Sequence, residues 1–256
     1  KIANISIRKV NEMINDLPHE NINETSTEIP DWQTLSLNEI SYTYIGNEYG
    51  FSVGPIDLTF NKGEITFIVG GNGSGKSTLS KLITSHYFAQ QGSIYLDDTL
   101  IGSHNIASYR NQIAAIYNDY HLFEEILTEM NEEKKTAIQH YLTLLQLDKV
   151  VEVNDGKFSS LSLSDGQRKR LALLVAFLDD ADIYLFDEWA ADQDPIYKKY
   201  FYHDILKELK EKNKVVIVIS HDDMYYNCAD KVIVMEEGRV NKVILEDKQI
   251  STGIFA

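Results

Sequence analysis

The chain has 256 residues, 43% of them apolar and 25% charged, a composition that suits a globular domain with a sizeable core and excludes a disordered or collagen-like chain. Its formal net charge of -15 opposes binding to the phosphate backbone of nucleic acids, so we expect no nucleic-acid partner. Cys228 is the only cysteine, which excludes a disulfide framework and a cysteine-based zinc site.

The first 31 residues are predicted to lie outside the compact domain. Residues 2–17 place apolar side chains at helical spacing, which indicates an amphipathic helix. The stretch up to residue 31 is polar and acidic and contains Pro18 and Pro30, so it favours a linker. No apolar run has the roughly 18 residues that a membrane-spanning helix needs. We expect the compact domain to occupy residues 32–256.

The pattern after Trp32 predicts an α/β fold. Residues 35–60 suit short strands and turns. Strands are then expected at 64–69, 113–117, 183–186 and 215–219. These runs are nearly all apolar, as parallel strands buried on both faces should be. Residues 119–157 are acidic and helical in pattern and look like an insertion.

A phosphate-binding loop is predicted between the strand at 64–69 and the helix after it. Residues 70–77 match the pattern G-x-x-x-x-G-K-[ST]. Glycines let the backbone wrap a phosphate, Lys76 reaches the β- and γ-phosphates, and Ser77 is a ligand for Mg²⁺. The predicted ATP-binding residues of this segment are Gly70, Gly71, Asn72, Gly73, Ser74, Gly75, Lys76, Ser77 and Thr78.

Two adjacent carboxylates, Asp187 and Glu188, follow the buried strand at 183–186. Mg²⁺ prefers oxygen ligands and keeps several waters, so Asp187 is expected to hold its hydrated shell. Glu188 is then expected to orient and deprotonate the water that attacks the phosphate. Together with Lys76, these residues predict ATP hydrolysis.

The segment Leu163-Ser164-Asp165-Gly166-Gln167 resembles the LSGGQ signature of ABC transporter ATPases. Ser164 also suits the N-cap of a helix that runs to Leu178, and the helix dipole would favour an anion there. The resemblance implies that Ser164, Gly166 and Gln167 contact the ATP held by a second copy of the chain, so that an ATP-dependent homodimer encloses two ATP molecules.

Other positions match this family one by one. His221, after the strand at 215–219, resembles the switch histidine that bonds the γ-phosphate, which implies a catalytic role. Asp194 resembles the aspartate of the D-loop, which links the two ATP sites. Tyr44 resembles the aromatic residue that stacks on adenine, and Tyr42 is the alternative for that role.

Three positions depart from the common family pattern. Asn118 stands where the family usually has the Q-loop glutamine, a residue implied to touch both nucleotide and Mg²⁺. Asp165 replaces the first glycine of the signature, and residues 189–193 replace a proline-threonine-serine stretch. The segments 118–123, 187–195 and 219–223 resemble a bacterial branch of the family that exports cyclic peptides, microcins and peptide-siderophore precursors.

The resemblance implies a P-loop ATPase core of the RecA type, an antiparallel β subdomain and a helical subdomain at about 88–180. It also implies a transmembrane domain fused ahead of this chain, with residues 1–31 as its tail or linker. The chain would then work at the cytoplasmic face of the bacterial inner membrane, and the exported substrate would contact the membrane domain. A non-transport ABC ATPase and a nucleotide-sensing module are the alternatives.

Overall fold

The computed structural model describes residues 27–44, 50–126 and 130–245, and the statements below concern these residues. The amphipathic helix expected at 2–17 and most of the expected linker lie outside the described residues. Within the described part, no helix is both long and apolar enough to cross a bilayer.

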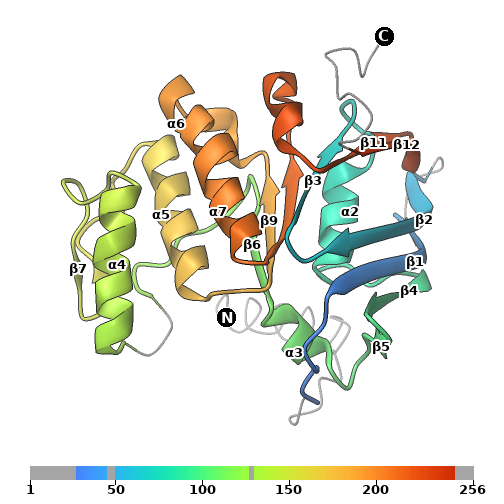
Figure 1. Ribbon diagram of the computed structural model, residues 1–256, viewed down its shortest axis with the longest axis horizontal. Helices are drawn as coiled ribbons and strands as arrows, with labels where there is room; N and C mark the ends of the chain where they lie inside the picture. The colour runs from blue at the N-terminus through green and yellow to red at the C-terminus, as the bar shows by residue number, and fades with distance from the viewer. Residues whose placement is uncertain (1–26, 45–49, 127–129, 246–256) are drawn as a thin grey trace, which may run out of the picture.

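A six-stranded sheet forms the centre of the molecule (Figure 1). Its strands follow the order β12-β11-β3-β10-β9-β6, and all neighbours are parallel except β11 and β12. The expected strands at 64–69, 113–117, 183–186 and 215–219 are confirmed to within one residue. The bounds are β3 (Glu64–Val69), β6 (Ile113–Ile116), β9 (Ile183–Asp187), β10 (Val215–Ile219), β11 (Lys231–Glu236) and β12 (Arg239–Leu245).

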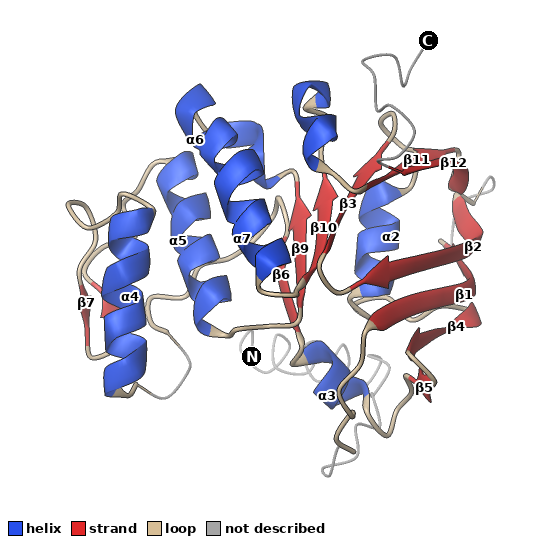
Figure 2. Ribbon diagram, in the orientation of Figure 1, coloured by secondary structure: helices blue, strands red, loops and turns tan. Residues whose placement is uncertain are grey.

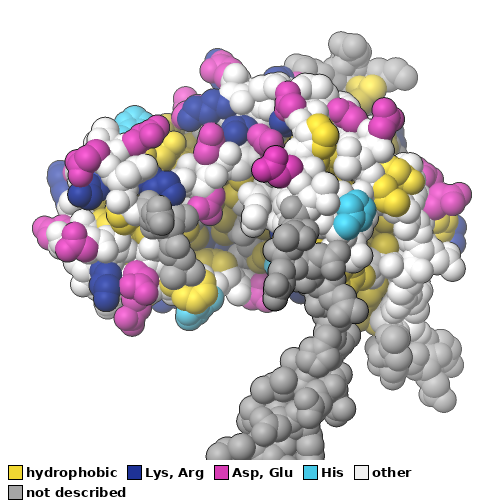
Figure 3. Space-filling model, turned by 90° about the horizontal axis from the view of Figure 1, so that it is seen from below, with side chains coloured by type: hydrophobic (Ala, Val, Ile, Leu, Met, Phe, Trp, Pro, Cys, Tyr) yellow, Lys and Arg dark blue, Asp and Glu magenta, His cyan; other side chains and the backbone are white. Residues whose placement is uncertain are grey.

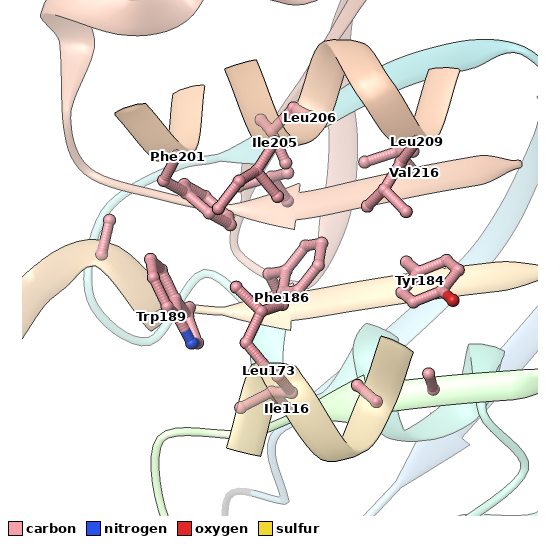
Figure 4. Packing of buried hydrophobic residues seen from close by; sticks show 14 of the residues in the cluster. Ile116, Leu173, Tyr184, Phe186, Trp189, Phe201, Ile205, Leu206, Leu209 and Val216 are labelled. Carbon is pink, nitrogen blue, oxygen red and sulfur yellow. The ribbon is translucent and has the colours of Figure 1, made fainter. Parts of the chain in front are cut away.

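Helices cover both faces of this sheet (Figure 2). On one face α2 (Lys76–Ile83) packs with Ile68 and Leu185, and on the other α5 (Asp165–Leu178) packs with Phe67 and Phe186. Neighbouring residues of a strand point to opposite faces, so the two helices lie on opposite sides of the sheet. Figure 4 shows Leu173 of α5 beside Phe186 of β9, with Leu206 and Leu209 of α7 (Leu206–Glu211) close by.

A second, antiparallel sheet of four strands lies beside the first, in the order β2-β1-β4-β5. Its strands are β1 (Thr34–Thr43), β2 (Ser52–Asn61), β4 (Gln91–Leu96) and β5 (Thr99–Leu100). This sheet contains the strands expected within residues 35–60 and is extended by residues 91–100. Apolar residues of β1 and β2 join the same core as α2.

The helical part starts later than residue 88. Residues 91–100 form β4 and β5, α3 (Ile106–Arg110) follows, and β6 belongs to the central sheet. These strands are short and half-polar, so their periodicity is weak. The later helical part contains α4 (Glu132–Leu144), the hairpin of β7 (Val153–Asn154) and β8 (Lys157–Phe158), and α5.

The chain between β9 and β11 is mostly helical. It runs through η1 (Trp189–Asp192), α6 (Pro195–Tyr200), the π-helical turn η2 (Phe201–Ile205), α7, β10 and η3 (Asp223–Cys228). Figure 3 shows the molecule from below, with acidic and basic side chains interspersed on that face. The arrows of β9 and β10 point away from that side in Figure 2, so the carboxyl ends of the parallel strands meet at the opposite edge.

Candidate functional site

The predicted phosphate loop joins the carboxyl end of β3 to α2 through residues 70–75. Gly70 has φ of 151° and Gly75 has φ of 100°, a region that favours glycine. A Cβ atom on Gly70 would lie 2.3 Å from the Met235 carbonyl oxygen, and one on Gly75 would lie 2.9 Å from Val53 Cγ2. Gly71, in contrast, faces open space. The glycines at 70 and 75 are therefore required by the backbone itself.

Lys76 is buried at the first turn of α2. Its ammonium donates to the carbonyl oxygens of Gly70 at 2.8 Å and of Gly71 at 3.0 Å, and so lies against the loop. Burial lowers the pKa of Lys76, and the negative charges of Glu188 and Asp187 oppose that shift. A buried cation at the start of a helix, with two carboxylates near it, suits the binding of an anion together with a divalent metal.

Ser77 and Asp187 are the predicted oxygen ligands for such a metal. The Ser77 side chain lies near enough to the Asp187 carboxylate to lower its pKa, although the two residues come from α2 and β9. Burial and the neighbouring charge of Glu188 raise the pKa of Asp187, while the Ser77 side chain and Lys76 oppose the rise. A bound divalent cation would relieve this repulsion, and a hydroxyl beside a carboxylate matches the ligand preference of Mg²⁺.

Glu188 and His221 meet at the ends of two neighbouring strands. Because β9 and β10 are parallel with Asp187 opposite Ile219, the residues that follow these strands lie side by side. Glu188 Oε1 lies 3.2 Å from His221 Nε2, and 35% and 46% of the two side chains are exposed. A carboxylate that is paired with an imidazole and open to solvent is able to take a proton from a water molecule.

Asn118 follows β6, and its side chain is joined to a residue that the sequence reasoning missed. Asn118 Oδ1 accepts a hydrogen bond from Lys169 Nζ at 3.3 Å. The contact made by Asn118 is thus to a lysine of α5, and its expected role toward nucleotide and Mg²⁺ stays a prediction. The sequence feature that could have indicated Lys169 is its position on the face of α5 where the other buried residues are apolar.

Ser164 caps α5 as expected. Its hydroxyl accepts from the Gln167 N–H at 3.3 Å, and Gln167 Oε1 accepts from the Ser164 N–H at 3.0 Å, which completes a capping box. The Gly166 carbonyl oxygen accepts a hydrogen bond from Gln193 Nε2 at 3.1 Å. The signature residues start a helix on the opposite sheet face from α2, so the fold separates them from the phosphate loop of the same chain (Figure 1).

Asp194 caps the next helix. Its Oδ1 accepts from the N–H groups of Ile196 at 3.0 Å and Tyr197 at 3.1 Å, and Pro195 occupies the first position of α6. A local capping role therefore accounts for this aspartate within one chain. Its expected part in linking two ATP sites stays a prediction.

The two adenine candidates differ in their surroundings. The Tyr44 hydroxyl lies 3.1 Å from Thr78 Oγ1, one residue past the phosphate loop. Tyr42 instead stacks on Tyr87 with ring centroids 5.0 Å apart, and Tyr44 meets Tyr42 edge-on at 5.2 Å. Tyr44 also meets Tyr87 edge-on with ring centroids 6.0 Å apart, so both tyrosines have aromatic neighbours. The expected contact of Tyr44 with adenine, and Tyr42 as its alternative, stay predictions.

Comparison with known proteins places this site among ATP-binding domains. A family model described as ABC transporter matches residues 53–191. The ATP-binding protein SyrD of Pseudomonas syringae pv. syringae is 40% identical over 212 residues, which are 81% of this chain and 38% of SyrD. The nisin transport ATP-binding protein NisT of Lactococcus lactis subsp. lactis is 31% identical over 241 residues, 88% of this chain and 40% of NisT.

The fold comparison agrees with the expected fold class. The solved structure of a bacterial Atm1-family ABC exporter with ATP bound superimposes with a TM-score of 0.77 at 18% identity. The match covers 94% of this chain and 44% of the exporter chain. The chain thus spans less than half the length of these proteins.

Proposed function

Because this chain belongs to the ABC transporter family as an ATP-hydrolysing domain, we propose that it powers export of a substrate across a bacterial inner membrane. One observation supports the role of this chain in ATP hydrolysis. The phosphate loop, the Ser77–Asp187 pair and the Glu188–His221 pair lie close together. All three lie at the carboxyl ends of the adjacent parallel strands β3, β10 and β9.

The phosphate loop would bind and orient ATP. Backbone N–H groups of residues 70–77 and the start of α2 favour a bound anion, and Lys76 adds a charge beside the β- and γ-phosphates. Ser77 and Asp187 would hold hydrated Mg²⁺, which supplies charge neutralisation on the phosphate oxygens when it is bound.

Glu188 and His221 would act on the attacking water. The carboxylate of Glu188 accepts the proton from water as the oxygen approaches the γ-phosphorus, and the bond to the leaving ADP breaks. The imidazole, held 3.2 Å from that carboxylate, is placed to keep it oriented and to hydrogen-bond the γ-phosphate. Both residues therefore act in positioning and charge stabilisation, which dominate catalysis of phosphoryl transfer.

A second copy of the chain would complete each ATP site. The helix start at Ser164 lies across the sheet from its own phosphate loop, yet it is exposed and carries the positive end of a dipole. We assign it to the γ-phosphate of ATP held by the partner, in an ATP-dependent homodimer.

The exporter role requires a transmembrane domain, which we propose is fused ahead of this chain. The chain would then work at the cytoplasmic face of the membrane. The short segments 118–123, 187–195 and 219–223 favour a cyclic peptide, microcin or siderophore-type peptide as substrate. The likeness to a protein named for nisin transport supports this class. The substrate would contact the membrane domain.

Two measurements test the proposal. Purified protein should release phosphate from Mg-ATP, whereas a nucleotide-sensing module would bind ATP without turnover. The encoded sequence upstream of Lys1 should contain apolar segments of about 20 residues, each long enough to span a bilayer. An upstream sequence without such segments would favour the non-transport alternative.

A further inference from the structure

Lys169 is a buried cation in the second turn of α5, and only 2% of it is exposed. Burying an ammonium group is costly unless it is paired and hydrogen-bonded. Its three N–H donors have three oxygen partners. These are Asp192 Oδ2 at 2.7 Å, the Glu188 carbonyl oxygen at 3.1 Å and Asn118 Oδ1 at 3.3 Å.

The three partners come from two segments of the site described above, the turn η1 that follows β9 and the residues that follow β6. Glu188, the proposed general base, and Asp192 lie at the two ends of η1, and Asn118 follows β6. One ammonium thus joins these segments to the helix that begins next to Ser164.

The backbone of Glu188 has an unusual conformation that this contact supports. Its φ is 53° and its ψ is 31°, a left-handed geometry that residues other than glycine rarely adopt. The Glu188 N–H donates to the Ile219 carbonyl at 3.0 Å, which fixes one side of the residue. On its other side, the carbonyl accepts from Lys169 Nζ and from the Ala191 N–H at 3.1 Å.

A second bond ties the same two segments together in the reverse direction. The indole N–H of Trp189, the residue after Glu188, donates to the Lys169 carbonyl at 2.9 Å. Trp189 is itself buried, with 1% of it exposed. Displacement of α5 would therefore pull on both sides of the peptide unit that follows the proposed base.

We propose that Lys169 is a positioning residue for ATP hydrolysis, which holds the left-handed turn at Glu188 in place relative to α5. This inference rests on the proposed role of Glu188 as the base. In the proposed homodimer, Ser164 acts at the ATP of the partner and Glu188 acts at the ATP of its own chain. Lys169 then connects, within one chain, the signature helix of one site to the base of the other.

The test compares substitutions of Lys169 with a matched control. Lys169→Met keeps the length of the side chain but removes its charge and its hydrogen-bond donors. Lys169→Arg keeps the charge and the donors. Lys214→Met is the control, because Lys214 is also buried and pairs with Asp180 and Asp182. Each purified protein is assayed for kcat and KM with Mg-ATP and for ATP affinity by titration.

We expect Lys169→Met to lower kcat by about 10- to 100-fold, the cost of a misplaced catalytic group, and to leave ATP affinity nearly unchanged. Lys169→Arg should recover part of the loss, and Lys214→Met should keep the native kcat. A native kcat in Lys169→Met, or a loss caused by weaker ATP binding alone, would overturn the proposal.

Thermal unfolding shows whether Lys169→Met is folded. If it is not, a comparison of two other variants tests the proposal. Lys169→Gln and Lys169→Arg both keep a polar donor, but only arginine keeps the charge. The proposal requires a higher kcat for arginine, and equal values would contradict it. A wild-type protein without phosphate release would overturn the proposed function and this role together, whereas an active wild type with an equally active Lys169→Met overturns this role alone.

Discussion

The hydroxyl oxygens of Tyr202 and Ser220 lie 2.7 Å apart, and this contact joins the π-helical turn η2 to the end of β10. Tyr202 also donates to Asp222 Oδ2 at 3.2 Å, and the Asp222 N–H donates to Ser220 Oγ at 3.0 Å. Ser220 and Asp222 flank His221, so the buried tyrosine braces the loop that carries the proposed switch histidine.

Replacement of Tyr202 by Phe should therefore destabilise the protein and lower activity. Removal of the hydroxyl leaves the buried Ser220 hydroxyl less well satisfied, at a cost of about 1–3 kcal/mol. We expect a lower free energy of unfolding in denaturant and a reduced kcat. Tyr226→Phe is the control, because its hydroxyl bond to the Ser220 carbonyl is long, at 3.5 Å, and its loss should matter less.

Replacement of Glu188 by Gln should separate binding from chemistry. The amide keeps the shape of the side chain but cannot take a proton from water, so turnover should fall by about 10²- to 10⁴-fold. The affinity for Mg-ATP should remain close to native. Phosphate release and a nucleotide titration measure the two effects, and turnover near the native rate would show that Glu188 is not the base.

Replacement of Lys76 by Ala should instead weaken nucleotide binding. It removes the buried ammonium of the phosphate loop, and charge-assisted hydrogen bonds are worth about 1.5–3 kcal/mol each. We expect the dissociation constant for Mg-ATP to rise at least tenfold, about 1.4 kcal/mol. An unchanged constant would contradict the assignment of residues 70–77.

Asp187 gives a prediction about pH. Its pKa is raised above the ordinary value, chiefly by burial, so protonation favours the folded state. The stability that Asp187 contributes is present at acidic pH and is lost as the pH rises through its folded pKa. Asp187→Asn should therefore raise the melting temperature at neutral pH without metal, while removing the stabilisation by Mg-ATP. Thermal unfolding at two pH values with and without Mg-ATP tests this, and a lower melting temperature in metal-free buffer would contradict it.

The parts of the site that follow directly from strand ends were predictable from the sequence. Asp187, Glu188 and His221 follow apolar runs, and the register of parallel strands then brings them together. Lys169 was not predictable, because a charged residue in a helix is usually exposed and its three partners are distant in the sequence. The start of the helical part was misplaced for a similar reason, since β4 and β5 depend on pairing with β1 and with each other.

The proposed homodimer gives the last prediction, with Ser164 as the test residue. Two chains at -15 each repel at long range, so added salt should first favour the dimer by screening and then weaken it as phosphate contacts are screened. In the Glu188→Gln background, where ATP persists, sedimentation velocity should show a dimer with Mg-ATP and a smaller species without it.

Ser164→Arg places a bulky side chain at an exposed helix cap that should face the ATP of the partner. We expect this variant to lose ATP-dependent dimerisation while the monomer keeps nearly native ATP affinity, because the phosphate loop lies on the other side of the sheet. The local cost should be limited to the cap, about 1 kcal/mol of stability. Ser162→Arg, at an exposed position just before the signature, is the matched control. A loss of monomer affinity in Ser164→Arg would place Ser164 in the ATP site of its own chain, and the shared-site arrangement would be wrong.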